Sequence, residues 1–180
     1  MRVITGKARG VRLKTPEGKD TRPTTDRVKE ALFSAIQFEI EGRRVLDLFA
    51  GSGQLGIEAL SRGADKAVFV DMSKKAVALV KENLKLTKLQ EQAQVIQADY
   101  MSFLSRNREN FGLIFLDPPY AEDFLEKSLQ KIVEFDILIS GGIIVTERPD
   151  NKALDLEFPG YVRSKDYHFG STLFTMYRKQ

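Results

Sequence analysis

The feature that most constrains the fold of this chain is a strand–turn–helix pattern that repeats from residue 43 onward. Segments with helical spacing of apolar residues separate short apolar runs typical of buried strands, which cover residues 45–49, 67–70, 93–97, 113–116 and 142–146. This alternation predicts an α/β fold with a mostly parallel, seven-stranded sheet, right-handed crossovers and helices on both faces. Two last β-like stretches, 161–167 and 171–178, predict a C-terminal hairpin that adds an antiparallel strand at one edge.

The first 42 residues follow a different pattern. Short β-like stretches broken by Gly and Pro predict a small N-terminal β-hairpin within residues 1–23. Thr24 and Thr25 are N-cap candidates for a helix, and apolar residues of helical period follow them as far as Ile36. We therefore expect a basic hairpin extension over residues 1–23 and one larger domain over residues 24–180.

The positive charge of the chain is concentrated near its N-terminus. Residues 1–30 carry nine Lys or Arg against four acidic residues, a balance of +5, whereas the whole chain has a formal net charge of +3. Such a patch suits a polyanion, because each neutralised phosphate releases counterions. A solvated basic arm without a partner explains the same charge equally well.

Composition excludes several classes of protein. The chain has no Cys, which rules out disulfides and Cys-ligated metals, and its single His168 argues against a His-cluster zinc site or a His-dependent catalytic triad. No apolar run reaches the ~18 residues that span a bilayer. The N-terminus lacks the apolar core of a signal peptide. We expect a cytoplasmic protein with no metal and no membrane partner.

Three segments at expected strand ends indicate a nucleotide-like cofactor. Residues 47–56, Asp-Leu-Phe-Ala-Gly-Ser-Gly-Gln-Leu-Gly, fit a G-x-G-x-x-G turn in which Gly51 and Gly53 let the backbone approach a ligand. Asp71 ends the second strand, where a carboxylate binds ribose hydroxyls in NAD and S-adenosylmethionine sites alike. Asp99 ends the third strand and can either bind an adenine amino group or cap the next helix.

A fourth segment distinguishes methyl transfer from hydride transfer. Asp117-Pro118-Pro119-Tyr120 follows the fourth strand and has no role in hydride transfer. An exocyclic amine is a poor nucleophile because its lone pair is delocalised into the ring. The Asp117 carboxylate and the Pro118 carbonyl could hold both amino hydrogens, the prolines could fix that carbonyl, and Tyr120 could stack on an unpaired base. The segment therefore predicts an amino methyltransferase whose catalytic residues are Asp117, Pro118, Pro119 and Tyr120.

The two motifs together resemble those of the class I, Rossmann-like amino methyltransferases. Three further segments resemble a narrower family, the bacterial ribosomal small-subunit methyltransferase D family: residues 6–13, residues 22–33 and residues 56–64. The resemblance covers nearly the whole chain and is weakest over 150–165. It implies methylation of guanine N2 in 16S rRNA, with the small subunit or its assembly precursor as partner, S-adenosylmethionine as cofactor and a monomeric enzyme.

The resemblance also assigns residues to the two ligands. It implies that Arg9, Arg12, Lys14 and Arg22 contact rRNA. It implies that the cofactor is bound by Thr24, Thr25, Arg27, Gly51, Gly53, Asp71 and Asp99. We also expect cofactor contacts from residues in the same segments: Asp47, Phe49, Met72 and Tyr100. Family members often have Glu where this chain has Asp71, and the shorter acid should still reach the ribose.

Three alternatives stay open at this point. A DNA or other RNA amino methyltransferase, acting on adenine N6 or cytosine N4, would use the same chemistry, although 180 residues leave little room for a target-recognition domain. A catalytically idle RNA-binding scaffold would keep the fold alone. A dinucleotide-dependent oxidoreductase would use the same glycine turn.

Overall fold

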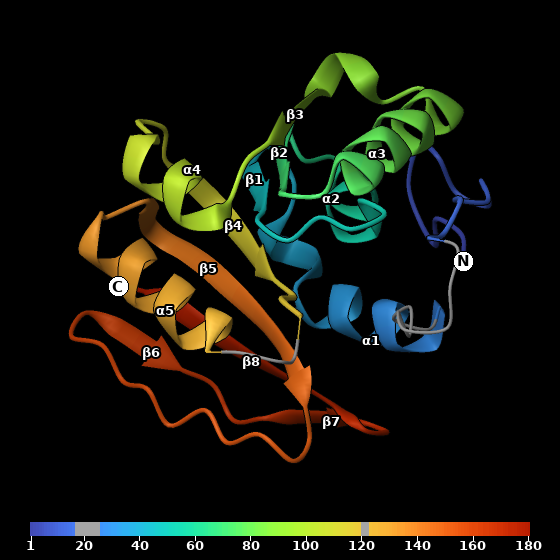
Figure 1. Ribbon diagram of the computed structural model, residues 1–180. Coiled ribbons are helices and arrows are strands. Elements are labelled where there is room, and N and C mark those ends of the chain that lie inside the picture. Colours follow the sequence, from blue (N-terminus) through green and yellow to red (C-terminus); the bar gives the residue numbers. More distant parts are fainter. Residues whose placement is uncertain (17–25, 120–122) are drawn as a thin grey trace.

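The computed structural model describes residues 1–16, 26–119 and 123–180 of the chain. Its centre is a twisted sheet in which five parallel strands lie side by side in the order β3-β2-β1-β4-β5 (Figure 1). Their bounds are Arg44–Asp47 for β1, Lys66–Asp71 for β2, Ala93–Gln97 for β3, Phe111–Leu116 for β4 and Leu138–Pro149 for β5. Strand order reverses between β1 and β4, and in such sheets ligands bind outside the carboxyl ends of the strands at this reversal.

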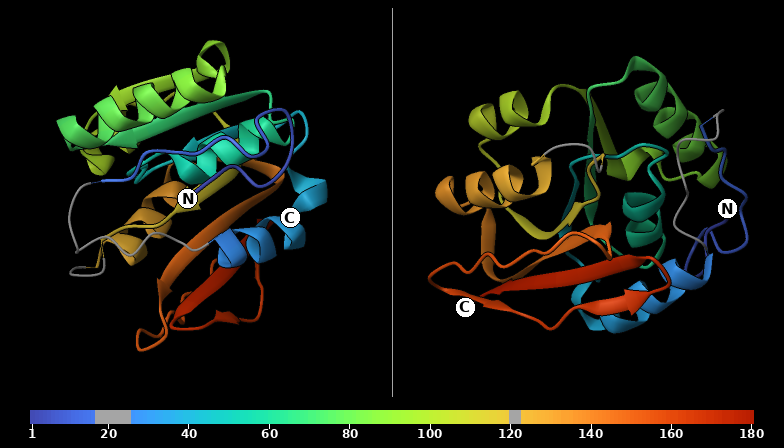
Figure 2. Two further views of the ribbon diagram at one scale, coloured as in Figure 1. Left: turned by 90° about the vertical axis from the view of Figure 1, so that its right-hand side faces the viewer. Right: turned by 60° about the horizontal axis from the view of Figure 1, so that its bottom comes forward.

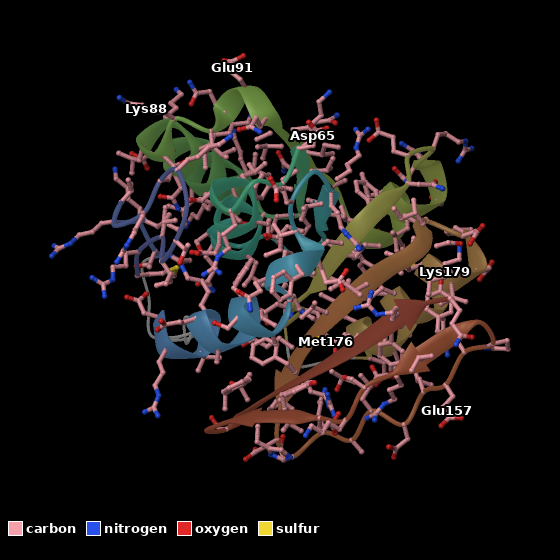
Figure 3. All side chains as sticks on the ribbon, turned by 180° about the vertical axis from the view of Figure 1, so that it is seen from behind. Asp65, Lys88, Glu91, Glu157, Met176 and Lys179 are labelled. Atoms are coloured by element: carbon pink, nitrogen blue, oxygen red, sulfur yellow. The ribbon has the colours of Figure 1, made fainter. Side chains whose placement is uncertain are left out.

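Helices cover both faces of the sheet, as the alternating pattern predicts (Figure 2). One face packs against α1 (Asp26–Ala35), α2 (Gln54–Ser61) and α3 (Lys74–Thr87), and Met176, labelled in Figure 3, packs against the same cluster. The other face packs against α4 (Tyr100–Arg106) and α5 (Phe124–Glu134). Two short 3₁₀ turns, η1 (Gln37–Glu39) and η2 (Gln90–Gln92), complete the connections. Ser73 caps α3 by accepting a hydrogen bond from the Ala76 N–H at 3.3 Å.

The C-terminal hairpin differs in detail from the expected one. Its first arm is divided into β6 (Tyr161–Arg163) and β7 (Tyr167–Phe169), and both pair antiparallel with β8 (Thr172–Lys179). Strand β8 in turn pairs antiparallel with β5. Within the described residues the sheet therefore has eight strands and not the seven expected. The division falls at Asp166, which turns inward to accept hydrogen bonds from Arg148, Arg163 and Thr175.

Residues 1–16, here called the N-terminal arm, fold back on themselves with a single β-bridge between Arg2 and Arg12. The arm is not a detached extension, because Val3, Ala8 and Leu13 are buried in the same core cluster as α1 and α2. No helix in the described part of the chain is both long enough and apolar enough to cross a membrane. The arm and the main domain thus share one hydrophobic core.

A buried ionic cluster fixes the arm to two helices. Glu58 of α2 is fully buried and accepts hydrogen bonds from the backbone N–H groups of Ile4 (2.9 Å) and Thr5 (3.0 Å). The same carboxylate lies 3.3 Å from the buried Lys29 ammonium of α1 and 2.8 Å from Arg62 Nε. Lys29 also donates to the Arg2 carbonyl, which closes the cluster.

Candidate active site

The segments singled out from the sequence meet at one edge of the sheet. Asp47, Asp71 and Asp117 end β1, β2 and β4 or follow directly, and these strands are parallel neighbours around β1. Their carboxylates are close enough that Asp71 and Asp117 both raise the pKa of Asp47. The parallel pairing therefore brings together residues that are 24 to 70 positions apart in the sequence.

The glycine turn between β1 and α2 needs its glycines at two positions. Gly51 and Gly53 have φ values of 53° and 78°, in the left-handed region that side chains disfavour. A Cβ at Gly51 would meet no atom within 4 Å, so the turn borders open space where a ligand could approach. Asp71 holds this turn, since its two carboxylate oxygens accept hydrogen bonds from the N–H groups of Gly51 (2.9 Å) and Ser73 (2.8 Å). A carboxylate offers about four lone-pair sites, so Asp71 keeps capacity for ribose hydroxyls.

Asp47 lies beneath the turn. Its side chain is buried and accepts a 3.0 Å hydrogen bond from the Gly56 N–H at the start of α2. Burial raises the pKa of Asp47 to about 7, and the neighbouring carboxylates of Asp117 and Asp71 add to the increase. The structure thus places Asp47 as a support of the turn, and a direct contact with a cofactor stays a prediction.

The raised pKa of Asp47 gives a testable stability effect. The folded protein binds a proton that the unfolded chain has lost between pH 3.8 and about 7, so Asp47 lowers stability progressively as pH rises through this window. We expect Asp47→Asn to remove this loss, which amounts to as much as about 4 kcal/mol above pH 7 for such a shift. Urea unfolding of both proteins at pH 5 and pH 8 would measure the effect. If the difference in unfolding free energy between wild type and Asp47→Asn is the same at pH 5 and pH 8, the expectation is contradicted.

Asp117 follows a fully buried strand and is itself half-buried. Every residue of β4 is buried, Pro118 is buried and Pro119 is exposed, whereas Tyr120 lies outside the described residues. Burial raises the pKa of Asp117 well above its usual value, and the carboxylate of Glu147 raises it further. A pKa raised in this way, at the carboxyl end of a parallel sheet, is typical of functional carboxylates.

Aromatic side chains line the neighbouring part of this edge. The rings of Phe49 and Tyr100 lie 5.3 Å apart, and both contact Phe124 of α5, at 6.3 Å and 5.5 Å. The predicted cofactor residues Phe49 and Tyr100 are therefore brought together by the fold. Met72, the residue after Asp71, has an exposed apolar side chain that is 73% accessible.

Asp99 has the helix-capping role that the sequence left open. Its Oδ2 accepts a 3.0 Å hydrogen bond from the Ser102 N–H at the start of α4. Its side chain is exposed, so binding of an adenine amino group stays compatible with this role. Of the other predicted cofactor residues, Arg27 is exposed on α1, while Thr24 and Thr25 lie outside the described residues.

Sequence analysis did not assign three residues of this edge to the site. Phe124 completes the aromatic group, and Glu147, 5% exposed, lies on β5 beside Asp117. Gln54, the residue after Gly53, is buried, and its Oε1 accepts no hydrogen bond within the described ranges. Glu147 carried a readable signal, because an acid directly after an apolar strand is the pattern that identified Asp71 and Asp117.

The predicted RNA-binding cations lie on the N-terminal arm. Arg9, Arg12 and Lys14 are all exposed, and Arg22 lies outside the described residues. Lys14 pairs with Glu82 of α3, so part of its charge is already neutralised. The backbone of Lys14 is bound on both sides by the buried Asn83 amide, which also donates to the Ser52 carbonyl of the glycine turn at 2.9 Å. The arm is thereby attached next to the turn.

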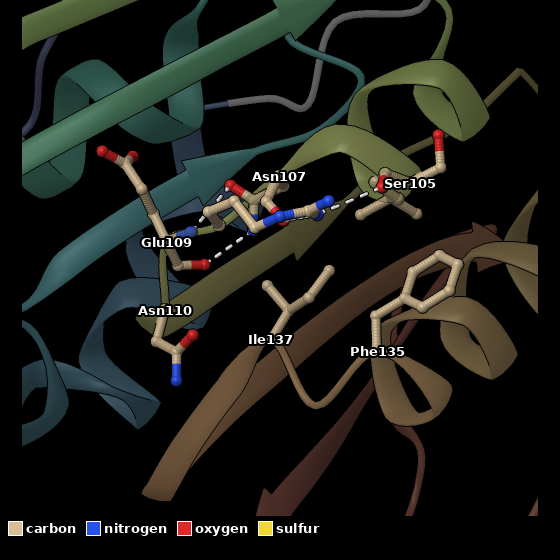
Figure 4. A pocket seen from close by; sticks show the side chains of 8 residues that line it. Ser105, Asn107, Glu109, Asn110, Phe135 and Ile137 are labelled. Atoms are coloured by element: carbon tan, nitrogen blue, oxygen red, sulfur yellow. Dashed lines mark hydrogen bonds between the residues drawn. The ribbon is translucent and has the colours of Figure 1, made fainter.

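The opposite edge of the sheet has a small cavity of about 280 Å³ (Figure 4). It lies between the end of α4, the start of β4 and the end of α5, and Ser105, Glu109 and Phe135 are among its lining residues. Arg108 there donates to the carbonyls of Ser105 and Asn107. In the portion of the chain that is described, no group of three or more His, Asp or Glu side chains could hold a metal ion.

Fold and site together define a class of protein. A parallel sheet with an antiparallel strand after β5, a glycine turn after β1 and an acid ending β2 form the S-adenosylmethionine-binding fold of methyltransferases. The structure of "Putative methyltransferase yhhF" from Escherichia coli matches with a TM-score of 0.90 at 32% identity, over 100% of this chain and 98% of that chain. The predicted α/β methyltransferase fold is therefore confirmed.

Sequence comparisons identify the family. The family model described as "Conserved hypothetical protein 95" matches residues 1–178, so the chain belongs to this family. "Putative rRNA methyltransferase YlbH" from Bacillus subtilis is 43% identical over the full length of both chains. "Ribosomal RNA small subunit methyltransferase D" from Haemophilus influenzae is 38% identical, over 86% of this chain and 81% of that protein. These relatives confirm the family resemblance drawn from the sequence, and the expected cofactor S-adenosylmethionine agrees with family and fold.

Proposed function

We propose that this chain transfers a methyl group from S-adenosylmethionine to the exocyclic N2 amino group of a guanine in 16S rRNA, on the small ribosomal subunit or its assembly precursor. The observation that carries the proposal is the position of Asp117 and Pro118, which follow β4 beside the glycine turn and Asp71. The relatives named small subunit methyltransferase D support the choice of rRNA.

The residues at this edge fit a cationic nucleoside cofactor. Asp47, Asp71, Asp117 and Glu147 gather at this edge, and their negative charge suits the positive sulfonium and amino groups of S-adenosylmethionine. Asp71 would bind the ribose, and the turn at Gly51 would let the backbone lie close to the ligand. The adenine would be contacted by Phe49, Met72 and Tyr100. When bound, the cofactor supplies an electrophilic methyl group.

The residues after β4 would act on the base. The Asp117 carboxylate and the Pro118 carbonyl would accept the two hydrogens of the amino group and so direct its lone pair. As the new C–N bond forms and the C–S bond breaks, the amine acquires positive charge and releases one proton to Asp117. A raised pKa favours this role, since a carboxylate with higher proton affinity is the stronger base. Positioning of the amine in line with the methyl group would supply much of the rate.

The test is methylation of small subunits from cells that lack this protein. Labelled S-adenosylmethionine is supplied, and the digested nucleosides are analysed by mass. We expect label in N2-methylguanosine with the wild-type chain and none with Asp117→Ala. Label in methylated adenine or cytosine would replace the proposal with another amino methyltransferase. Cofactor binding without any transfer, to subunits or to free rRNA, would favour an RNA-binding scaffold.

The N-terminal arm would hold rRNA through phosphate contacts, which position a substrate without reading its sequence. We expect the double substitution Arg9→Ala and Arg12→Ala to weaken rRNA binding and to reduce the slope of log K against log salt by about one to two. Replacing Lys14 as well should add less, because Lys14 pairs with Glu82. The matched control is Arg106→Ala with Arg108→Ala, two exposed arginines near the opposite edge. Equal slopes for both double variants would remove the arm from the RNA site.

A further inference from the structure

Glu147 is a second carboxylate beside Asp117, on the adjacent strand. Strands β4 and β5 are parallel and in register, with Phe115 opposite Val145 and Leu116 opposite Thr146. The next pair along the two chains is Asp117 and Glu147. Side chains alternate between faces along a strand, and Phe115 and Val145 both belong to the core cluster under α1 and α2. Asp117 and Glu147 are therefore directed to the same face, and their electrostatic interaction agrees with this placement.

The pair is costly to the fold. Glu147 is 5% exposed, and a buried carboxylate next to another carboxylate opposes folding through desolvation and like-charge repulsion. The neighbouring polar residues of β5 take part in packing: Thr146 donates to the Thr175 carbonyl, and Arg148 donates to Thr175 Oγ1 and to Asp166. Two carboxylates side by side at the carboxyl end of the strands suit a substrate that presents two N–H donors side by side.

Guanine brings such a donor. Its reacting amino group at C2 is flanked on one side by N1–H, so the Watson–Crick edge presents N–H donors side by side. In adenine and cytosine the ring nitrogen next to the amino group is a lone-pair acceptor on this edge. A carboxylate beside the amine-binding group accepts the N1–H of guanine and repels the ring lone pair of the other two bases. Buried polar groups that are left unpaired by the wrong substrate are an effective source of discrimination.

We infer that Glu147 is the specificity-determining residue of this site, which selects guanine by accepting a hydrogen bond from its N1–H while Asp117 and Pro118 hold the amino group. The inference rests on the proposed function and adds the reason why guanine is the base. It also assigns separate tasks to the two acids: Asp117 acts on the amine and its proton, and Glu147 reads the neighbouring ring nitrogen.

The experiment changes both sides of this contact. The target guanine, once mapped, is replaced by 2-aminopurine in rRNA ligated from synthetic and transcribed fragments and reconstituted into subunits. 2-Aminopurine keeps the amino group at C2, but it lacks O6 and its N1 is an acceptor, so the change of the preference in a Glu147 variant isolates the N1 contact. We expect the wild-type chain to prefer guanine by about 10- to 100-fold in kcat/KM, the range of one specific base contact. Glu147→Gln offers an amide N–H to N1 and should reduce this preference at least about tenfold.

Two control variants separate reading of the base from support of the strand. Thr146→Val perturbs β5 on the opposite face of the same strand, and it should leave the guanine preference at the wild-type value. Glu147→Asp retains a carboxylate and should retain a preference for guanine. A structural role for Glu147 predicts instead that Glu147→Gln lowers kcat/KM for both bases by the same factor, which would overturn the inference.

The outcomes also separate this inference from the proposed function. If the wild-type chain methylates no guanine, both fail together. If it methylates guanine and 2-aminopurine equally well, the proposed function stands and the role of Glu147 is overturned, and this comparison needs no variant to fold. If it prefers guanine and Glu147→Gln loses that preference, the inference is supported.

Discussion

Asp117→Asn is expected to lower the rate of methyl transfer by about 10²- to 10⁴-fold, the usual contribution of a positioned proton acceptor, while leaving S-adenosylmethionine affinity within a few-fold of wild type. Asparagine keeps the shape of the side chain and a carbonyl that can hold one amino hydrogen. It cannot accept the proton that the amine releases. Asp117→Ala removes both functions and should be slower still.

Comparison of the two variants separates two functions of Asp117, holding an amino hydrogen and accepting the released proton. Single-turnover rates report chemistry, and calorimetric titration with S-adenosylmethionine reports cofactor binding. If Asp117→Asn retains more than a tenth of the wild-type rate, Asp117 is not the proton acceptor. If both variants lose cofactor affinity in proportion to rate, Asp117 belongs to the cofactor site and not to the base-binding residues.

The second large effect concerns the fold. Glu58→Gln is expected to lower the free energy of unfolding by about 3–5 kcal/mol, as for other broken buried ion pairs. Four donors converge on this carboxylate: two backbone N–H groups of the arm, the Lys29 ammonium and Arg62 Nε. Lys29 is fully buried, and burial already lowers its pKa, an effect that Glu58 opposes. Without Glu58, that ammonium loses its ion-pair partner.

Two further variants test this explanation by urea unfolding. Glu109→Gln breaks the more exposed Arg44–Glu109 pair and should cost no more than about 1 kcal/mol, the usual range for surface pairs. Adding Lys29→Met to Glu58→Gln removes the isolated ammonium and should recover part of the lost stability, since replacing both partners of a buried pair is often close to neutral. A loss below about 1 kcal/mol for Glu58→Gln alone would show that the cluster contributes little.

Much of the fold and part of the candidate site could be predicted from local patterns. The strand runs 45–49, 67–70, 93–97, 113–116 and 142–146 overlap β1 to β5, because a buried parallel strand needs consecutive apolar residues between turn signals. Asp71 was identified because it ends such a run, and Gly51 and Gly53 because they form a glycine motif in the turn after a strand. The structure adds that both glycines have left-handed backbone. The eighth strand was missed, since the division of one hairpin arm falls at Asp166, whose partner Arg148 is 18 positions away in the sequence.

The sequence by itself determined which segments are strands and helices, where the glycine turn lies, and which acids follow the strands, because these features depend on neighbouring residues. Only the tertiary structure decided which acids face each other. Asp117 and Glu147 became a pair through the register of β4 and β5, and Glu58 became the centre of a buried cluster through contacts with residues more than 50 positions away. Periodicity reports backbone conformation and burial, whereas electrostatic partnership depends on strand register and helix packing, which no local pattern contains.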